Sequence, residues 1–300
     1  MISYSRVETA MYEAMKTAAL KMPPDVLDVL QKAMKEESDP LAKMHLELSL
    51  QNAMFASEGK GLICGDTGFP LFFVKAGNRT EVEGGFGRLW DAARAAVAKA
   101  TAESFLRPTM VDPLTRSNPG NNIFRGMPKV ELSFEGEGNS LEIIAAPKGG
   151  GSEIFGTFYK MLFPSDGKTG IMKFIIECIK DGCYAGKICP PAIVGVGIGG
   201  TADLCMKLAK EAALLRTVGT HSSIPEIAEM ETKLLSAIRE SGIGPMGSKG
   251  INAVMALNIE TAATHTAALP VAVNAQCLVG RRWKAIISGD DSKITYTGTL

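Results

Sequence analysis

The feature that most limits the fold of this chain is an apolar run, Ala192–Ile198, that leads through Gly195-Val-Gly197-Ile-Gly-Gly200 into a helical pattern from Thr201 to Arg216. A short apolar run bounded by glycines is typical of a buried strand. A strand followed directly by a helix belongs to folds that combine sheets with covering helices. We therefore predict the α+β or α/β class, with a mixed sheet flanked by helices.

The rest of the chain agrees with this class. Apolar residues recur every three or four positions from about Arg6 to Phe55, which predicts a helical N-terminal part over residues 1–56. Val130–Phe134 and Leu141–Ala146 alternate, and the glycine-bearing segment between them favours a β-hairpin. Further strands are predicted at 71–74, 254–259 and 271–274, and further helices at 85–102, 170–181 and 225–241. Because no linker interrupts the pattern, we predict one domain over residues 1–300.

Charge and hydropathy exclude several functions. The 32 basic and 32 acidic residues cancel, so no bulk field attracts nucleic acid or an anionic membrane. No apolar run reaches the roughly 20 residues that cross a bilayer, and residues 1–6 do not begin a secretion signal. Six cysteines scattered through a chain of this length argue against a disulfide framework. We expect a cytoplasmic protein.

Two glycine motifs suggest nucleotide chemistry. Gly195–Gly200 matches the G-x-G-x-x-G dinucleotide fingerprint, which makes an NAD(P)-dependent oxidoreductase an alternative. That fold also needs a second strand ending in an acidic residue, and no convincing strand follows Arg216. Close packing of a strand on a helix is the other explanation. Gly242–Lys249 resembles a phosphate loop with its last residues reversed, and its amides could approach an anion.

The cysteines divide into two groups. Cys178 and Cys205 lie in predicted helices among apolar residues, where a thiol usually packs as a small hydrophobe. Cys183 is ambiguous. The other three lie in predicted loops with unusual neighbours: Cys64 in Cys-Gly-Asp-Thr-Gly, Cys189 in Cys-Pro-Pro, and Cys277 in Asn-Ala-Gln-Cys. Spacing alone leaves open whether these three share a site.

Several motifs together resemble a known family. Cys64-Gly-Asp-Thr-Gly, Lys148-Gly-Gly-Gly-Ser, Cys189-Pro-Pro, the Gly195–Gly200 series, Gly242-Ile-Gly-Pro, and His265 twelve residues before Cys277 occur in this order. In that order they are similar to the α component of class I fumarases and L-tartrate dehydratases. The resemblance runs through nearly the whole chain. It implies a hydro-lyase that adds or removes water at a small dicarboxylic acid.

The resemblance also implies a cofactor. Cys64, Cys189 and Cys277 would bind a [4Fe–4S] cluster through three of its irons, whereas the ordinary cluster has four cysteine ligands. The fourth iron would then be open to act as a Lewis acid on the substrate. Oxygen sensitivity is expected for such a cluster.

The resemblance also implies roles for individual residues, each matched by its position in a shared motif. Asp66 corresponds to an aspartate of the proton-transfer system, and His265 to an active-site histidine. Arg107 corresponds to a carboxylate-binding arginine, Gly150 to a backbone amide at a substrate carboxylate, and Lys249 to a weaker substrate contact. Arg281 and Arg282 follow the last cysteine, and we expect them to be a solvated pair.

This chain departs from the family's pattern in two places. Many relatives have glutamine where this chain has Gly65, so the pocket should be larger or less polar, and a substituted dicarboxylate becomes an option. Single-chain relatives continue into a second domain, whereas this chain stops at Leu300. A separate β subunit is therefore expected to complete the site in an α2β2 assembly. A non-catalytic iron–sulfur sensor is the remaining alternative.

Overall fold

The computed structural model describes residues 1–300, and the chain forms two compact units. Unit 1 contains residues 1–23, 53–150 and 281–300, and unit 2 contains residues 24–52 and 151–280. Each unit is assembled from segments that are far apart in the sequence. The one-domain organisation expected for residues 1–300 stays a prediction. None of the helices is both long and apolar enough to cross a membrane.

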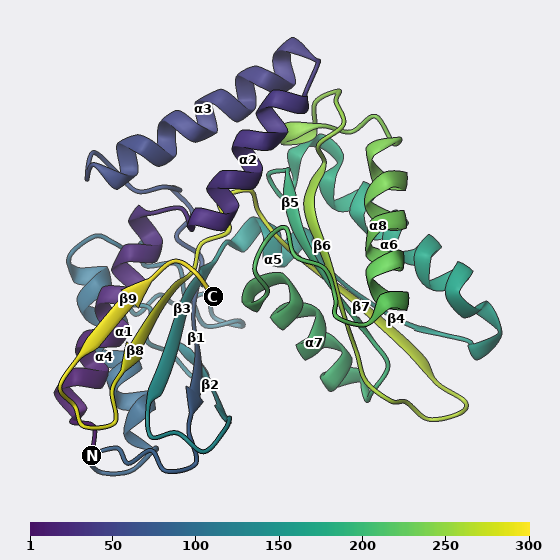
Figure 1. Ribbon diagram of the computed structural model, residues 1–300. Coiled ribbons are helices and arrows are strands. Elements are labelled where there is room, and N and C mark those ends of the chain that lie inside the picture. Colours follow the sequence, from purple (N-terminus) through teal and green to yellow (C-terminus); the bar gives the residue numbers. More distant parts are fainter. The chain divides into compact units, whose positions relative to one another are not determined.

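Unit 1 is built on a five-stranded sheet in the order β2-β1-β3-β8-β9. Helices α1 and α4 pack on it, and their alanine-rich faces meet the alternate residues Phe72, Val74, Ile143 and Ala285 in one core (Figure 1). The bounds are α1 Tyr4–Leu20, β1 Phe69–Ala76, α4 Arg88–Ala102, β2 Lys129–Phe134, β3 Leu141–Lys148, β8 Trp283–Ile287 and β9 Ile294–Thr297.

The predicted β-hairpin of Val130–Phe134 with Leu141–Ala146 is wrong. Both strands exist as β2 and β3, but β1 lies between them, parallel to β2 and antiparallel to β3. Five of the eight β1 residues in a row, Pro70–Val74, are buried, whereas β2 has a single buried residue. The more apolar β1 therefore takes the central position, and β2 forms the edge.

Unit 2 is built on a four-stranded sheet in the order β4-β7-β5-β6. Helix α7 packs on one face, and α6 and α8 contribute to the apolar core that includes Val194, Val196, Leu257 and Val273 (Figure 1). The bounds are α2 Pro24–Glu36, β4 Thr157–Leu162, α6 Gly167–Cys183, β5 Ala192–Ile198, α7 Ala202–Leu215, α8 Pro225–Arg239, β6 Val254–Thr261 and β7 Leu269–Gln276. In α3, Pro40–Ser57, and α5, Gly150–Phe155, the chain passes between the units.

The class predicted from the sequence is confirmed, because both sheets are mixed and helices cover them. The N-terminal part is helical as expected, and Asp39 caps α3 by accepting hydrogen bonds from the N–H groups of Leu41 and Ala42, both at 3.0 Å. No pattern in the sequence predicted α5, β4, β8 and β9. These elements are short or lie beside glycines, where periodicity is hard to read.

Two glycines of the fingerprint are explained by contact between β5 and α7. A Cβ atom on Gly195 would lie 2.0 Å from the carbonyl oxygen of Ala209, and one on Gly197 would lie 2.0 Å from that of Cys205. No side chain fits at such distances. The packing explanation of these glycines is therefore confirmed.

We predict that Gly197→Ala lowers the free energy of unfolding by about 3 kcal/mol, because α7 must move away from the sheet. Gly61→Ala is the matched control, since no atom lies within 4 Å of its added Cβ, and its change should stay within about 0.5 kcal/mol. Urea unfolding followed by circular dichroism measures both. Equal stability of the two variants would contradict the contact.

Candidate functional site

The loop that carries Cys64 is joined to Arg107. This irregular segment connects α3 to β1, and Cys64 is half-buried. The guanidinium Nη1 of Arg107 donates to the carbonyl oxygen of Gly65 at 3.0 Å, and its backbone N–H donates to Thr67 Oγ1 at 2.9 Å. Arg107 itself is exposed, so its remaining N–H groups are accessible. The structure thus brings together two parts of the predicted site that are forty residues apart.

Asp66 and Gly150 are also neighbours. The backbone N–H of Gly150 donates to Asp66 Oδ2 at 2.6 Å. A Cβ on Gly150 would lie 3.2 Å from the same oxygen, so glycine allows this close approach. Gly68 packs more tightly still, because a Cβ added there would lie 1.9 Å from the carbonyl oxygen of Lys148. The amide predicted to meet a substrate carboxylate therefore holds the carboxylate of Asp66 in this structure.

Asn122 is a positioning residue that the sequence did not reveal. It is 1% exposed, and its Nδ2 donates to the carbonyl oxygen of Arg107 at 2.9 Å and to Thr101 Oγ1 at 3.0 Å. Its Oδ1 accepts from the N–H groups of Thr109 and Met110 at 2.8 and 3.1 Å. The only signal in the sequence was the presence of an asparagine in the Pro- and Gly-rich segment 109–128. In the structure this asparagine adopts a φ of 62°.

Cys189 and Cys277 lie in loops that are joined by a hydrogen bond. Cys189 is exposed and has a φ of 52°, just before the cis pair Pro190-Pro191. Cys277 directly follows β7, and the next residue, Leu278, donates its N–H to the carbonyl oxygen of Cys189 at 3.1 Å. Two of the three cysteines predicted to share a site are therefore neighbours in unit 2.

Lys249 lies in the glycine-rich loop that follows α8, and this loop packs on the Cys189 segment. The N–H of Met246 donates to the carbonyl oxygen of Pro190 at 2.8 Å, and a Cβ on Gly247 would lie 2.2 Å from Gly186 N. Lys249 is exposed. The predicted substrate contact is thus carried by a loop adjoining that of Cys189.

The glycine-rich loop does not form the anion-binding nest that its sequence allowed. Its backbone N–H groups donate to carbonyl oxygens, most of which belong to the loop itself. The donors are the N–H groups of Gly244, Met246, Gly247, Ser248 and Gly250. The buried carboxylate of Glu37 fixes the end of the loop, accepting from Ile251 N at 3.1 Å and Asn252 Nδ2 at 3.0 Å. Burial raises the pKa of Glu37, but these hydrogen bonds outweigh it and lower the pKa below its ordinary value.

His265 lies at the opposite end of the unit 2 sheet from Cys277. It is exposed in the loop between β6 and β7. The N–H of Ala267 donates to His265 Nδ1 at 3.2 Å, so in the neutral imidazole the proton sits on Nε2. Eight residues of β7 separate this loop from Cys277. At roughly 3.3 Å per residue, the strand spans about 25 Å.

Two glycines at the end of the fingerprint hold the His265 loop. Gly199 has a φ of 89°, and its N–H donates to the carbonyl oxygen of Pro270 at 2.9 Å. The N–H of Gly200 donates to the carbonyl oxygen of Ala263 at 3.2 Å. A Cβ on Gly199 would lie 2.0 Å from the carbonyl oxygen of Ala262. These glycines therefore position a histidine loop.

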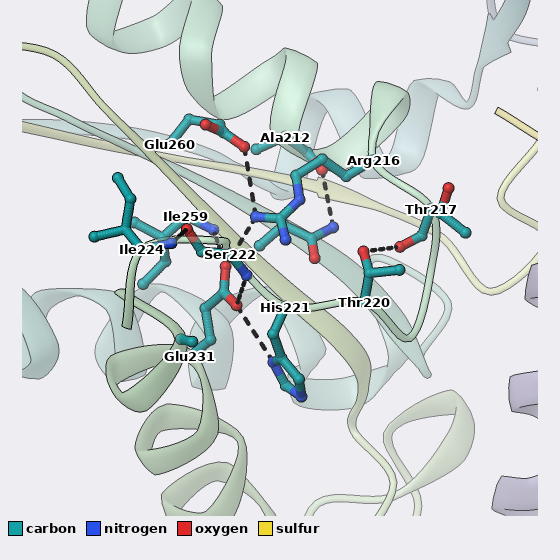
Figure 2. Close-up of polar contacts among 12 residues, drawn as sticks. Ala212, Arg216, Thr217, Thr220, His221, Ser222, Ile224, Glu231, Ile259 and Glu260 are labelled. Atoms are coloured by element: carbon teal, nitrogen blue, oxygen red, sulfur yellow. Dashed lines mark hydrogen bonds and ion pairs between the residues drawn. The ribbon is translucent and has the colours of Figure 1, made fainter. Parts of the chain in front are cut away.

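The second strand that a dinucleotide-binding fold needs is absent. Residues 216–224 connect α7 to α8 without a strand, and the carboxylate of Glu231 anchors this connection (Figure 2). Glu231 is 0% exposed. It accepts hydrogen bonds from Arg216 Nη1 at 2.9 Å, Ser222 N at 3.0 Å and Ile259 N at 2.9 Å. This buried carboxylate has a structural partner for each oxygen, and no acidic residue is presented to a ribose.

The predicted solvation of Arg281 and Arg282 is wrong, because each is 1% exposed. The prediction was wrong because it relied on charge alone, and most arginines lie on the surface. Nε and Nη2 of Arg281 have no hydrogen-bond partner. Buried guanidinium groups of this kind are uncommon, because an unpaired donor costs stability.

The remaining cysteines are packing residues, as predicted for Cys178 and Cys205. Cys178, Cys183 and Cys205 are 5%, 0% and 0% exposed. Burial raises the pKa of the Cys178 and Cys183 thiols to about 12 and that of Cys205 to about 11. None of the six cysteines forms a disulfide. No three His, Cys, Asp or Glu side chains are grouped as ligands of a single metal ion.

Comparison with known proteins assigns the family. A model of the family described as Fumarate hydratase (Fumerase) matches residues 8–286. The chain belongs to the fumarate hydratase family. This confirms the resemblance inferred from its motifs, and it indicates a hydro-lyase. Nothing in the comparison supports the oxidoreductase alternative.

Relatives within the fumarate hydratase family carry a more specific name. A Methanocaldococcus jannaschii protein provisionally named L(+)-tartrate dehydratase subunit alpha is 41% identical over 281 residues, covering 92% of this chain and 96% of that protein. The L(+)-tartrate dehydratase subunit alpha of Escherichia coli O157:H7 is 34% identical over 270 residues, covering 90% of this chain and 87% of its own. The corresponding protein of Escherichia coli K12 is 33% identical over the same length.

We predict that iodoacetamide at pH 8 modifies Cys189 in the native, cluster-free protein and leaves Cys183 and Cys205 intact. Thiolate is the reacting form, and a pKa of about 11 or 12 leaves only ~0.1% or less of it at pH 8. Cys189 is exposed. Peptide mass spectrometry with and without urea measures the pattern. Native labelling of Cys183 as fast as Cys189 would contradict the assigned burial.

Proposed function

We propose that this member of the fumarate hydratase family is the α subunit of an iron–sulfur hydro-lyase. It adds or removes water at a small dicarboxylate of the fumarate/malate or L-tartrate type. The observation that carries this proposal is the joining of the Cys64 loop, with its Asp66, to Arg107 and Gly150 by direct hydrogen bonds. A carboxylate-binding cation and a proton-transferring carboxylate are the groups that a dicarboxylate hydro-lyase needs beside its metal.

Cys64, Cys189 and Cys277 are the proposed ligands of a [4Fe–4S] cluster. Two features support the fit: the three cysteines lie in irregular segments, whereas the other three lie in helices α6 and α7, and Cys189 and Cys277 are joined through Leu278. Thiolates are the ligands that such clusters prefer. Each cysteine binds a different iron, so the ligands need not gather as around one ion. When bound, the cluster supplies a Lewis-acidic iron for the substrate hydroxyl.

Arg107 and Asp66 have proposed roles at the substrate. The forked guanidinium of Arg107 suits one substrate carboxylate, and its bond to Gly65 O holds one nitrogen in place while others stay accessible. Asp66 takes part in moving the proton at the carbon next to the reacting one. When Asp66 turns toward substrate, the Gly150 amide is released to donate to a second carboxylate oxygen. Lys249 adds positive charge near the Cys189 loop.

Substrate choice is proposed to depend on Gly65. A Cβ at this position would meet no atom within 4 Å, so a longer side chain would extend into open space. Glycine leaves that space for the substrate. A hydroxylated dicarboxylate such as L-tartrate is therefore favoured over fumarate, in agreement with the names of the relatives.

A β subunit is the proposed partner. The relatives are named as α subunits, and this chain covers 87–96% of the length of the relatives compared. The β subunit supplies the remaining substrate contacts in an α2β2 assembly. A cluster with an open iron needs reducing surroundings, so the cytoplasm is the proposed location.

His265 is proposed to act on the site of a second α subunit. It lies at the far end of β7 from Cys277, which is too far for the imidazole to reach a substrate bound beside its own Cys277. Its exposed Nε2–H points away from the bond that Nδ1 accepts. An α2β2 assembly brings two such histidines and two such sites together.

The cluster assignment is tested by anaerobic reconstitution with iron and sulfide in the presence of the β subunit. We expect about four irons per α chain and hydration or dehydration of L-tartrate, malate or fumarate. Cys64→Ser, Cys189→Ser and Cys277→Ser should each lose the iron and the activity, because each iron–thiolate bond is needed. Cys178→Ser is the control and should keep both.

Two other outcomes are informative. A cluster that does not depend on those three cysteines would remove the basis of the proposal. A normal cluster with no turnover of any dicarboxylate would point to an iron–sulfur sensor instead.

Action of His265 in trans is tested by mixing two inactive α subunits. Differently tagged His265→Ala and Cys277→Ser chains are produced together with the β subunit, and the doubly tagged assembly is isolated. One of its two sites then combines an intact Cys277 with an intact His265 from the other chain. We expect about half of the wild-type activity per assembly, as twofold symmetry requires.

The matched control mixes Cys189→Ser with Cys277→Ser, which leaves each cluster one cysteine short and should give no activity. If the His265→Ala and Cys277→Ser mixture is as inactive as this control, His265 acts within its own chain.

A further inference from the structure

Strand β4 forms an open edge of the unit 2 sheet. In the order β4-β7-β5-β6 it has a neighbour on one side only, and its register with β7 runs without a shift from Thr157 to Leu162 (Figure 1). The N–H of Ala275 donates to the carbonyl oxygen of Gly156 at 2.8 Å. Antiparallel pairs alternate, so Thr157, Tyr159 and Met161 direct their N–H and C=O groups away from β7. These backbone groups can pair with another strand.

An apolar surface accompanies this open edge. Tyr159 and Met161 are 40% and 50% exposed, and Phe163, just after the strand, is 74% exposed. Tyr159 pairs with Ala272, which packs against α7, so these side chains lie on the α7 face of the sheet. Phe155, at the end of α5, is 46% exposed. Exposed apolar side chains gathered beside an unpaired edge indicate an interface.

Devices that usually protect an edge are missing from β4. The strand has no proline and no bulge, and its one charged residue, Lys160, lies over the ring of Phe174 on the opposite face at 5.8 Å. The other edge strand, β6, is mostly buried and contacts α2. Of the two edges of this sheet, only the β4 edge is therefore available for pairing with another strand.

We propose that β4 pairs antiparallel with β4 of a second copy of this chain, about a twofold axis at Tyr159. Tyr159 then faces its own counterpart, and Thr157 of one copy faces Met161 of the other. The same register brings Phe155 of one copy to Phe163 of the other, so the exposed apolar side chains at both ends of the edge are covered. Twofold pairing of a strand with itself uses one surface twice, as closed dimers do.

This pairing has a consequence for His265, which rests on the proposed function. β4 begins beside Asn274, three residues before Cys277, and ends beside Leu269, four residues after His265. Antiparallel pairing sets the beginning of one β4 against the end of the other. The His265 end of one copy thus lies at the Cys277 end of its partner, which is the arrangement that action in trans requires.

A second exposed apolar surface serves as the comparison. Leu41, Met44 and Leu48 on α3 are 50%, 46% and 53% exposed at helical spacing. This helix surface offers no unpaired backbone groups. A twofold contact there would not set the His265 end of one copy at the Cys277 end of the other. Leu48→Lys is therefore a matched control for Tyr159→Lys.

The experiment measures the mass of the assembly by light scattering after co-production with the β subunit. We expect Tyr159→Lys to halve the α2β2 mass to that of an αβ pair, because two lysines meet across the axis. Tyr159→Glu should do the same for the same reason. Mixing the Tyr159→Lys chain with the Tyr159→Glu chain should restore the α2β2 mass, and an unfolded variant could not give this result. Leu48→Lys should leave the mass unchanged.

An α2β2 mass that survives Tyr159→Lys, or one that Leu48→Lys halves, overturns the β4 pairing. A wild-type mass of a single αβ pair overturns it as well. The mass is read independently of turnover, so loss of the hydro-lyase assignment would not alter the answer. If the proposed function also holds, the mixed Tyr159 assembly regains the activity that either variant alone has lost.

Discussion

The pairing of β7 between β4 and β5 determines which residues of this chain can act together. It fixes Cys277 at one end of the sheet, beside the start of β5 and the Cys189 loop, and places the His265 loop at the other end. Twelve residues separate His265 from Cys277 in the sequence, and an extended strand turns this short interval into the length of the sheet. A helix in the same place would have brought the two residues within about 18 Å.

The glycine series after Ala192 has two structural uses, neither of them nucleotide binding. Gly195 and Gly197 allow α7 to touch the sheet, and Gly199 and Gly200 dock the His265 loop. A fingerprint read from spacing alone cannot separate these uses from a phosphate turn, because close backbone approach is the shared requirement. What separates them is the next segment. Residues 216–224 are held by Glu231 and form no second strand.

Local patterns predicted most of the fold, whereas pairing between distant segments did not follow from them. The helices and the apolar strands were recoverable because each depends on neighbours in the sequence. The supposed hairpin failed because β1, some sixty residues earlier, inserts between β2 and β3. The burial of Arg281 and Arg282 and the role of Asn122 depend on contacts of the same long-range kind. The site residues themselves came from the order of motifs.

The contacts of the Cys64 loop explain how an irregular segment can serve as a precise site. Thr67 is 1% exposed and holds the backbone of Arg107, while Asn122 holds its carbonyl oxygen from the other side. Arg107 in turn donates to Gly65 O, and Asp66 is held by Gly150. Every one of these bonds joins segments at least 15 residues apart. Hydrogen bonds from small polar side chains thereby fix the conformation of the loop, as strand pairing fixes that of the sheet. The accessible nitrogens of Arg107 are therefore oriented before a carboxylate arrives.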